Sequence, residues 1–347
     1  MIRHRIHPRQ ALFAAHERSP ALPVCDHYAG VEARMRKALS LQGEFADQAL
    51  FDVTLDLEDG APVGGEQEHA LLVAALVNSA ANRFGRVGAR VHPLSNGHFV
   101  DDVRTLVGGA GDRLAYLMVP KVGSAAELAI AIALIERAQL EFGVQRRIPV
   151  HALVETHGAL RDVNALAALP QVESLSFGLM DFVSAHRGAI PAAGMSAHGQ
   201  FTHPLVLRAK IEIAAACHAA GKTPSHCVVT EFTHARAISE AATRASRELG
   251  FTRMWSIHPN QIKPIIEAFA PVTAEVDEAV EILTAAQAAQ WAPIAHRGVL
   301  HDRASYRYYW HVLERAERTG QPLPGEARES FFPAVEPSEL NSTENSA

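Results

Sequence analysis

The chain lacks most features that mark secreted, membrane-spanning or nucleic-acid-binding proteins. It has only three cysteines, Cys25, Cys217 and Cys227, and their spacing matches no zinc motif. No apolar run reaches the length of a membrane span. The formal net charge is −6 and no basic cluster offsets it, which argues against a nucleic-acid partner. Residues 1–9 are basic, but no apolar signal core follows them. We therefore expect a cytoplasmic protein with neither a nucleic-acid nor a membrane partner.

What the chain does have is the composition of a globular protein with a large core. Hydrophobic residues make up 48% of its 347 residues and charged residues 20%. This length exceeds that of a common single domain, but one α/β barrel with extensions accounts for it.

Eight short and mostly apolar stretches predict β-strands, and most of them end in a polar or charged residue. They are residues 21–26, 51–59, 88–93, 114–121, 150–155, 172–181, 226–231 and 253–259. Helical patterns lie between them, for example at residues 32–48, 125–142, 206–220 and 235–249. This alternation predicts a parallel sheet, and eight such units predict a (β/α)8 TIM barrel. A doubly wound open sheet is the alternative, but the dinucleotide-binding fingerprint that often accompanies it is absent.

The remaining segments predict extensions around the barrel. We expect an N-terminal extension at 1–20, the barrel at 21–270, a C-terminal helical segment at 271–319 and a disordered tail at 320–347. The helical segment holds two helical patterns, and the tail is rich in Pro, Ser, Glu and Asn. The Gly-rich connection at residues 184–203 predicts either a lid over the site or a surface loop.

Two carboxylates end neighbouring predicted strands. Glu155 follows Val150–Val154, and Asp181 ends the next apolar run, with a helical crossover between the two. The carboxyl ends of parallel strands meet at one edge of a sheet, so we expect these side chains to lie close together. Mg²⁺ binds to one or two carboxylates and completes its shell with water and substrate. The alternative is that each acid caps the helix that follows it.

Other strand ends carry Glu58, Asp59, Arg90, Lys121 and His258. Arg90 is suited to grip the carboxylate of an anionic substrate in bidentate fashion, and its alternative is a structural ion pair with Glu58 or Asp59. For Lys121 we favour a role as the electrostatic partner of nearby acids over a Schiff-base nucleophile. The 19 histidines are scattered and predict no zinc site.

Six motifs in order resemble one family. They are Leu55-Asp-Leu-Glu58-Asp59-Gly, Arg90-Val-His-Pro, Val119-Pro-Lys121-Val, Val154-Glu155-Thr, Phe177-Gly-Leu-Met-Asp181 and Gly250-Phe followed by Ile257-His258-Pro-Asn-Gln-Ile. Together they resemble the citrate lyase β-subunit-like branch of the HpcH/HpaI aldolase family, which includes malyl-CoA and citramalyl-CoA lyases. The resemblance covers roughly residues 50–315. The first predicted strand departs from the usual family sequence.

The resemblance implies a TIM barrel that binds Mg²⁺, with Mn²⁺ as the alternative ion. By motif match, Glu155 and Asp181 are the metal ligands, and Arg90 holds the carboxylate of a 2-oxo acid. Glu58 and Asp59 support the metal waters. Lys121 completes the substrate-binding set.

The resemblance also implies a catalytic group near the C-terminus. Gly298-Val-Leu-His-Asp302 resembles the segment that the CoA lyases of this family place over a neighbouring barrel, although the proline usual after the aspartate is missing. Asp302 is then the candidate acid/base, and the protein is a homo-oligomer, a trimer or a hexamer.

We therefore expect a Mg²⁺-dependent carbon–carbon lyase. It would cleave a 3-hydroxyacyl-CoA, such as malyl-CoA or citramalyl-CoA, into an acyl-CoA and a 2-oxo acid. Two alternatives are a CoA-independent 2-oxo acid aldolase and a citrate-lyase-β-like subunit that needs a partner chain.

Overall fold

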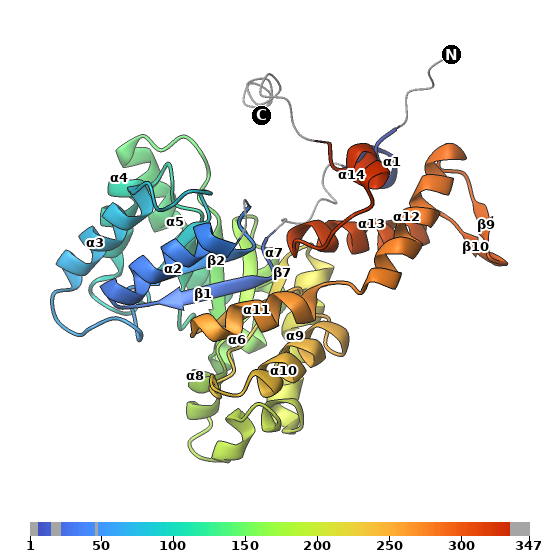
Figure 1. The fold of residues 1–347 in the computed structure, drawn as a ribbon. Helices are drawn as coiled ribbons and strands as arrows, with labels where there is room; N and C mark the ends of the chain where they lie inside the picture. The colour runs from blue at the N-terminus through green and yellow to red at the C-terminus, as the bar shows by residue number, and fades with distance from the viewer. Residues whose placement is uncertain (1–5, 15–21, 46–47, 334–347) are drawn as a thin grey trace. The chain divides into compact units, whose positions relative to one another are not determined.

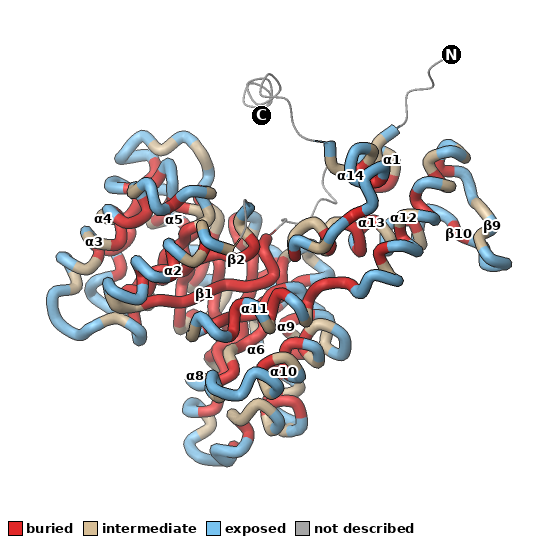
Figure 2. Tube along the Cα trace, in the orientation of Figure 1, coloured by how far each residue is buried: buried red, intermediate tan, exposed pale blue. Residues whose placement is uncertain are grey.

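The computed structural model of the chain describes residues 6–14, 22–45 and 48–333. It divides into two compact units, one within residues 19–269 and one made from residues 1–18 and 270–347. Each unit has its own cluster of buried apolar side chains, visible as buried segments in Figure 2. Within the described residues, no helix is both long and apolar enough to cross a membrane.

The first unit is a closed barrel of parallel strands (Figure 1). Its strands are β1 (Cys25–Ala29), β2 (Phe51–Asp56), β3 (Val87–Arg90), β4 (Leu117–Val119), β5 (Val150–Val154), β6 (Val172–Phe177), β7 (Thr223–His226) and β8 (Arg253–Ser256). Strand β1 pairs with both β2 and β8, which closes the barrel. The predicted (β/α)8 fold is therefore confirmed.

Helices connect successive strands of the barrel. They are α2 (Glu32–Phe45), α3 (Glu66–Asn78), α4 (Phe99–Ala110), α5 (Ala125–Phe142), α6 (His157–Arg161), α7 (Val163–Ala168), α8 (Leu179–Ser184), α9 (Pro204–Ala219), α10 (Ala235–Arg247) and α11 (Pro259–Phe269). Local chemistry sets their limits. Helix α5, for example, begins where the Ser124 side chain accepts a hydrogen bond from Glu127 N, and it ends at Gly143, whose φ of 72° favours glycine.

The second unit holds α1 (Pro8–Leu12), α12 (Thr273–Ala288), α13 (Arg303–Arg318), α14 (Gly325–Phe331) and the hairpin β9 (Ile294–His296) and β10 (Val299–His301). The helical extension predicted after the barrel is therefore present. Helix α14 lies within the tail that we expected to be disordered, and its Ala327 and Phe331 are buried in the second core. Two apolar anchors thus outweigh the polar composition around them. Residues 334–347 of that tail lie outside the described residues.

Several predicted boundaries are wrong, and β7 differs most. The apolar run at 226–231 predicted this strand, but the strand is Thr223–His226 and contains a proline. Inside a barrel, backbone pairing with two neighbouring strands defines the element, and β7 pairs with both β6 and β8. Polar residues such as Ser225 are accommodated because the barrel interior is itself partly polar. The first strand also begins later than predicted, at Cys25.

A fully buried ion-pair layer lies at the amino-terminal half of the barrel. Arg253, the first residue of β8, pairs with Asp26 on β1 at 3.0 Å and with Asp52 on β2 at 2.7 Å. Asp26 also accepts hydrogen bonds from Thr54 Oγ1 at 2.7 Å and from the Tyr116 hydroxyl at 3.1 Å. Buried charges persist only when they are paired, so this layer joins three strands through one guanidinium.

Replacing Arg253 with Met should lower the free energy of unfolding by about 3–5 kcal/mol, because Asp26 would remain buried without a cation. Urea unfolding at neutral pH, followed by circular dichroism, measures this change. The matched control is Arg236→Met, whose side chain is 92% exposed in its pair with Glu240 and should change stability by less than about 0.5 kcal/mol. Equal unfolding midpoints for the two variants would contradict a stabilising role for the buried layer.

Candidate active site

Two carboxylates meet where β5 and β6 end. Glu155 directly follows β5 and is buried, and Asp181 lies in the first turn of α8, beyond the end of β6 at Phe177. The predicted strand to Asp181 is therefore shorter than expected, but both acids reach the carboxyl-terminal end of the barrel. Neither caps the helix that follows through its side chain, because Thr156 caps α6 and Gly178 precedes α8.

The backbone packs closely around Glu155. A Cβ atom on Gly178 would lie 2.1 Å from Glu155 Oε2, so only glycine fits between β6 and α8. On the other side, Glu155 Oε1 accepts a hydrogen bond from the backbone N–H of Lys121 at 2.6 Å. Lys121 has a φ of 51°, a left-handed conformation that costs a non-glycine residue energy. This conformation holds a backbone donor on the carboxylate.

Arg90, the last residue of β3, is anchored by acids from the end of β2. Its Nε and Nη2 donate to the two carboxylate oxygens of Asp56, and the Nε bond to Oδ1 measures 2.7 Å. Its Nη1 lies 3.0 Å from Glu58 Oε2. The face of the Tyr28 ring lies 5.4 Å from the guanidinium carbon. The two hydrogen bonds to Asp56 leave three of the five N–H donors of the guanidinium, because the Nη1 contact with Glu58 is an ion pair and not a hydrogen bond.

The Lys121 ammonium lies between Glu58 and Asp59. It forms ion pairs with both carboxylates, at 2.9 Å to Asp59 Oδ2. Partial burial opposes its charge, but the two acids outweigh burial and raise the pKa of Lys121 above its ordinary value. Glu58 therefore forms ion pairs with both Arg90 and Lys121. This arrangement agrees with an electrostatic role for Lys121.

These groups surround one cavity of about 350 Å³ at the mouth of the barrel. Its polar wall contains Asp56, Asp59, Arg90, Glu155 and Asp181. Glu58 and Lys121 do not line the cavity, but they form ion pairs with Arg90 and Asp59 of this wall. The other wall is apolar and includes Tyr28, Phe177, Met180, Val228, Trp255 and Ile257. A small polar head and an apolar portion of one ligand can therefore be held together.

Glu155 has the electrostatics of a cation ligand. Burial, and then the negative charge of Asp181, raise the pKa of Glu155 to about 7. Within the described part of the chain, the Asp181 carboxylate has no hydrogen-bond or ion-pair partner. Two facing carboxylates with so little compensation fit one divalent cation, which would relieve their repulsion. Among the described residues, no cluster of three or more such ligands is present, so water or substrate oxygens would complete the shell.

Two residues of the predicted set lie elsewhere. His258 stacks on Phe232, with ring centres 4.8 Å apart, and does not line the cavity. Asp302 belongs to the second unit, where its Oδ1 caps α13 by accepting a hydrogen bond from Ala304 N at 2.9 Å. Asp56 was not among the predicted site residues, although an acid in the apolar run of β2 was a signal for it. The aromatic residues of the apolar wall gave no such signal.

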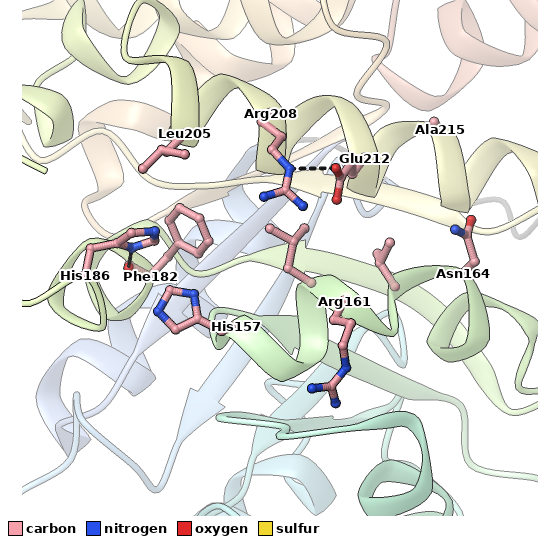
Figure 3. Close-up of a pocket in the computed structure, with 11 residues that line it drawn as sticks. His157, Arg161, Asn164, Phe182, His186, Leu205, Arg208, Glu212 and Ala215 are labelled. Carbon is pink, nitrogen blue, oxygen red and sulfur yellow. Dashed lines mark hydrogen bonds and ion pairs between the residues drawn. The ribbon is translucent and has the colours of Figure 1, made fainter. Parts of the chain in front are cut away.

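A second and larger groove, of about 640 Å³, lies outside the barrel between α6, α8 and α9 (Figure 3). Figure 3 shows the Arg208 guanidinium beside it, bonded through Nε to Glu212 at 2.8 Å. None of the strand-end residues predicted from the sequence lines this groove. Size alone therefore does not identify the active site, and the smaller cavity holds the convergent charged groups.

The fold is a TIM barrel, and the cavity at its mouth has an acidic wall. The model of the HpcH/HpaI aldolase/citrate lyase family matches residues 41–259, well over half of the chain. The chain belongs to this family. The predicted class of enzyme, a carbon–carbon lyase, is confirmed with it.

Known proteins share both sequence and fold with the chain. The L-malyl-CoA/beta-methylmalyl-CoA lyase of Rhodobacter capsulatus is 29% identical over 288 residues, which cover 79% of this chain and 90% of that protein. A crystal structure of a citrate lyase from Burkholderia xenovorans LB400 is 53% identical, with a TM-score of 0.81, and covers 94% of this chain and 100% of that one. The fold also matches protein CitE of Mycobacterium tuberculosis in complex with magnesium, acetoacetate and coenzyme A, at 21% identity and a TM-score of 0.64, over 86% of this chain and 99% of that one.

The raised pKa of Glu155 predicts a pH-dependent effect in cation-free protein. Its folded-state pKa of about 7 exceeds the ordinary 4.5, so the folded state binds more protons between these values and the wild type loses stability as pH rises through them. Glu155→Gln lacks this loss. Its free energy of unfolding should exceed that of the wild type by up to about 3 kcal/mol at pH 8 and converge with it near pH 4.

Chemical unfolding in the presence of a chelator, at several pH values, measures this difference. Glu68→Gln, which replaces an exposed acid on α3, is the control and should follow the wild type at every pH. A Gln variant that is less stable than the wild type at pH 8 would contradict the raised pKa.

Proposed function

We propose that the protein is a Mg²⁺-dependent lyase for a 3-hydroxyacyl-CoA that carries a free carboxylate, as malyl-CoA and citramalyl-CoA do. It would release an acyl-CoA and a 2-oxo acid. The observation that carries this proposal is the convergence of Glu155, Asp181 and Arg90 on one cavity. The name of the Rhodobacter capsulatus relative supports the substrate class.

Glu155 and Asp181 are the residues that would hold the metal. Their carboxylates suit a hard cation, either Mg²⁺ or Mn²⁺, and the magnesium in the CitE complex supports the first. Bound there, the ion would stabilise negative charge that develops on substrate oxygens. Lys121 contributes the backbone N–H that orients Glu155, and Gly178 leaves the space that the carboxylate needs.

Arg90 would bind the carboxylate of the 2-oxo acid. Asp56 accepts hydrogen bonds from two of its N–H groups and Glu58 forms an ion pair with it, so these acids would hold the guanidinium plane and leave donors for the ligand. A preorganised donor pair loses little conformational entropy when the substrate binds. Asp59 lines the cavity and pairs with the Lys121 ammonium, so the cation does not neutralise the acidic wall near Glu155 and Asp181.

Asp302 would be the acid/base that protonates the enolate of the acyl thioester, and removes the α-proton in the reverse direction. It would act on the barrel of a neighbouring subunit in a homo-oligomer, a trimer or a hexamer, as in the CoA lyases that the sequence resembles. Its exposed position at the start of α13, after the β9–β10 hairpin, leaves its second carboxylate oxygen available for such a contact.

The substrate pair can be found by mass spectrometry. Purified protein with Mg²⁺ is incubated with acetyl-CoA or propionyl-CoA and with glyoxylate, pyruvate or oxaloacetate, and EDTA is added to matched samples. A hydroxyacyl-CoA adduct that EDTA removes would support the lyase. No adduct from any pair would overturn the proposal. Activity on a CoA-free hydroxy-oxo acid would then favour the aldolase alternative, and rescue by a partner chain the subunit alternative.

Asp181→Ala should lower kcat in this assay at least about 100-fold, because it removes one of two acids that would hold the cation. Circular dichroism should show an unchanged fold, since Asp181 is only partly buried. Asp101→Ala, at an exposed acid on α4, is the matched control and should retain full activity. EDTA-sensitive activity in Asp181→Ala at the wild-type level would rule out this metal site.

Mixing two inactive variants tests whether Asp302 acts across subunits. Asp302→Asn and Asp181→Ala should each be inactive alone, whereas their co-expression should restore part of the activity. Some barrels in the mixed oligomer would then combine intact Glu155 and Asp181 with an intact Asp302 from a neighbouring subunit. Light scattering on the same samples reports the oligomeric state. No restoration in a mixed oligomer would place Asp302 on its own barrel or outside catalysis.

A further inference from the structure

Lys210 on α9 is a fully buried lysine without a carboxylate partner. Its Nζ donates to Gln200 Oε1 at 2.7 Å and to His226 Nε2 at 2.7 Å, and it lies 4.0 Å from the centre of the Phe201 ring. Within the described residues, no acid lies within ion-pair distance of it. Buried lysines are rare and are almost always ion-paired, so this arrangement calls for an explanation beyond packing.

Cys227 shares the same acceptor. Its Sγ donates to Gln200 Oε1 at 3.0 Å, so the separation between Lys210 Nζ and Cys227 Sγ cannot exceed the sum of these two bonds. Cys227 directly follows β7 and lines the active-site cavity, although only 1% of it is exposed to bulk solvent. A small reagent that reaches the Cys227 thiol from this cavity would therefore find the Lys210 amine beside it.

The surroundings of Lys210 increase the uncharged fraction of its amine relative to that of an exposed lysine. Burial lowers the pKa of Lys210 to about 8, so a substantial fraction is a neutral nucleophile near that pH. His226 is a neutral acceptor toward Lys210, because its Nδ1–H donates to the Cys227 carbonyl at 2.9 Å. Burial raises the pKa of the Cys227 thiol, and the nearby ammonium of Lys210 opposes this rise.

We propose that Lys210 and Cys227 form a covalent sulfenamide cross-link when a peroxide enters the active-site cavity. The Cys227 sulfur attacks the peroxide, the O–O bond breaks, and sulfenic acid and water form. The Lys210 nitrogen then attacks that sulfur, and the S–O bond breaks as the hydroxyl leaves with one amine proton as a second water. The sulfur is oxidised and the peroxide is reduced. An added thiol reverses the link by taking the sulfur and returning the amine.

The other two cysteines provide a control within the same chain. Cys25 and Cys217 are as buried as Cys227, but neither lines the cavity. Cys217 even has a lysine, Lys222, close enough to lower its thiol pKa slightly against the effect of burial. Cys217 and Cys227 therefore both lie near a lysine, but Cys227 lines the cavity and Cys217 does not.

Peptide mass spectrometry of the full-length protein tests this proposal without any variant. The protein is treated with hydrogen peroxide at about pH 8, where the amine is partly neutral, then alkylated and digested without reduction. The expected product joins the Lys210 and Cys227 peptides, with two hydrogens fewer than their sum, and disappears after dithiothreitol. A free or over-oxidised Cys227 with Lys210 in a linear peptide would overturn the proposal. So would equal oxidation of Cys25 and Cys217, or a link that contains an extra oxygen.

Two variants separate the steps. Lys210→Arg keeps a buried cation but removes the amine, so sulfenic acid should accumulate at Cys227 and be trapped by dimedone. Cys227→Ser should abolish both the link and the trapped adduct. A cross-linked species of unchanged mass in Cys227→Ser would show that another residue bonds to Lys210 and would overturn the assignment.

Discussion

Two fixed cations hold the acidic rim of this barrel together. Arg90 and Lys121 converge on Glu58, and each also pairs with a second acid, Asp56 or Asp59. Parallel strands in a closed barrel put all their carboxyl ends at one rim, so these charges cannot avoid one another. Without the two cations, the acids at the ends of β2, β5 and β6 would repel each other in a partly buried space.

These cations do not pair with every carboxylate at the rim, and the unpaired carboxylates are the ones available to a ligand. The two cations are paired with the acids that end β2 or follow it, whereas neither Glu155 nor Asp181 forms an ion pair within the described residues. By contrast, the buried carboxylates of Asp26 and Asp52 at the other half of the barrel are paired with Arg253. Asp52 also pairs with Arg86, and Asp26 accepts hydrogen bonds from the Thr54 and Tyr116 hydroxyls. Matched charge contributes to the stability of the barrel, and unmatched charge is available to a ligand.

Sequence patterns could predict the barrel and the placement of Glu155 and Asp181 at one rim, because both follow from periodicity and strand polarity. The apolar runs before Glu155 and Asp181 are strands wherever they are buried on both faces, and an acid after such a run reaches the rim. Glu58 was one of the expected partners of Arg90, but Asp56 was not predicted. Its pairing with Arg90 depends on the register between β2 and β3, and the residues of one strand alone do not fix its register against the next. The predicted bounds of β7 were wrong for a related reason. Pairing with β6 and β8 places a strand at residues that include a proline and polar side chains, which have low intrinsic preference for strands.

Two lysines show how environment decides chemistry for one residue type. Lys121 lies between two acids, which raise its pKa and favour the cation over the neutral amine that a Schiff base requires. Lys210 is surrounded by an amide, a neutral imidazole and an aromatic ring, and burial lowers its pKa to about 8. Lys121, the lysine suited to an electrostatic role, therefore pairs with acids at the rim of the barrel. Lys210, the lysine suited to nucleophilic attack, lies beside the Cys227 thiol. The two proposals thus rest on opposite properties of lysine, namely a fixed charge at the acidic rim and a neutral amine in the cross-link with Cys227.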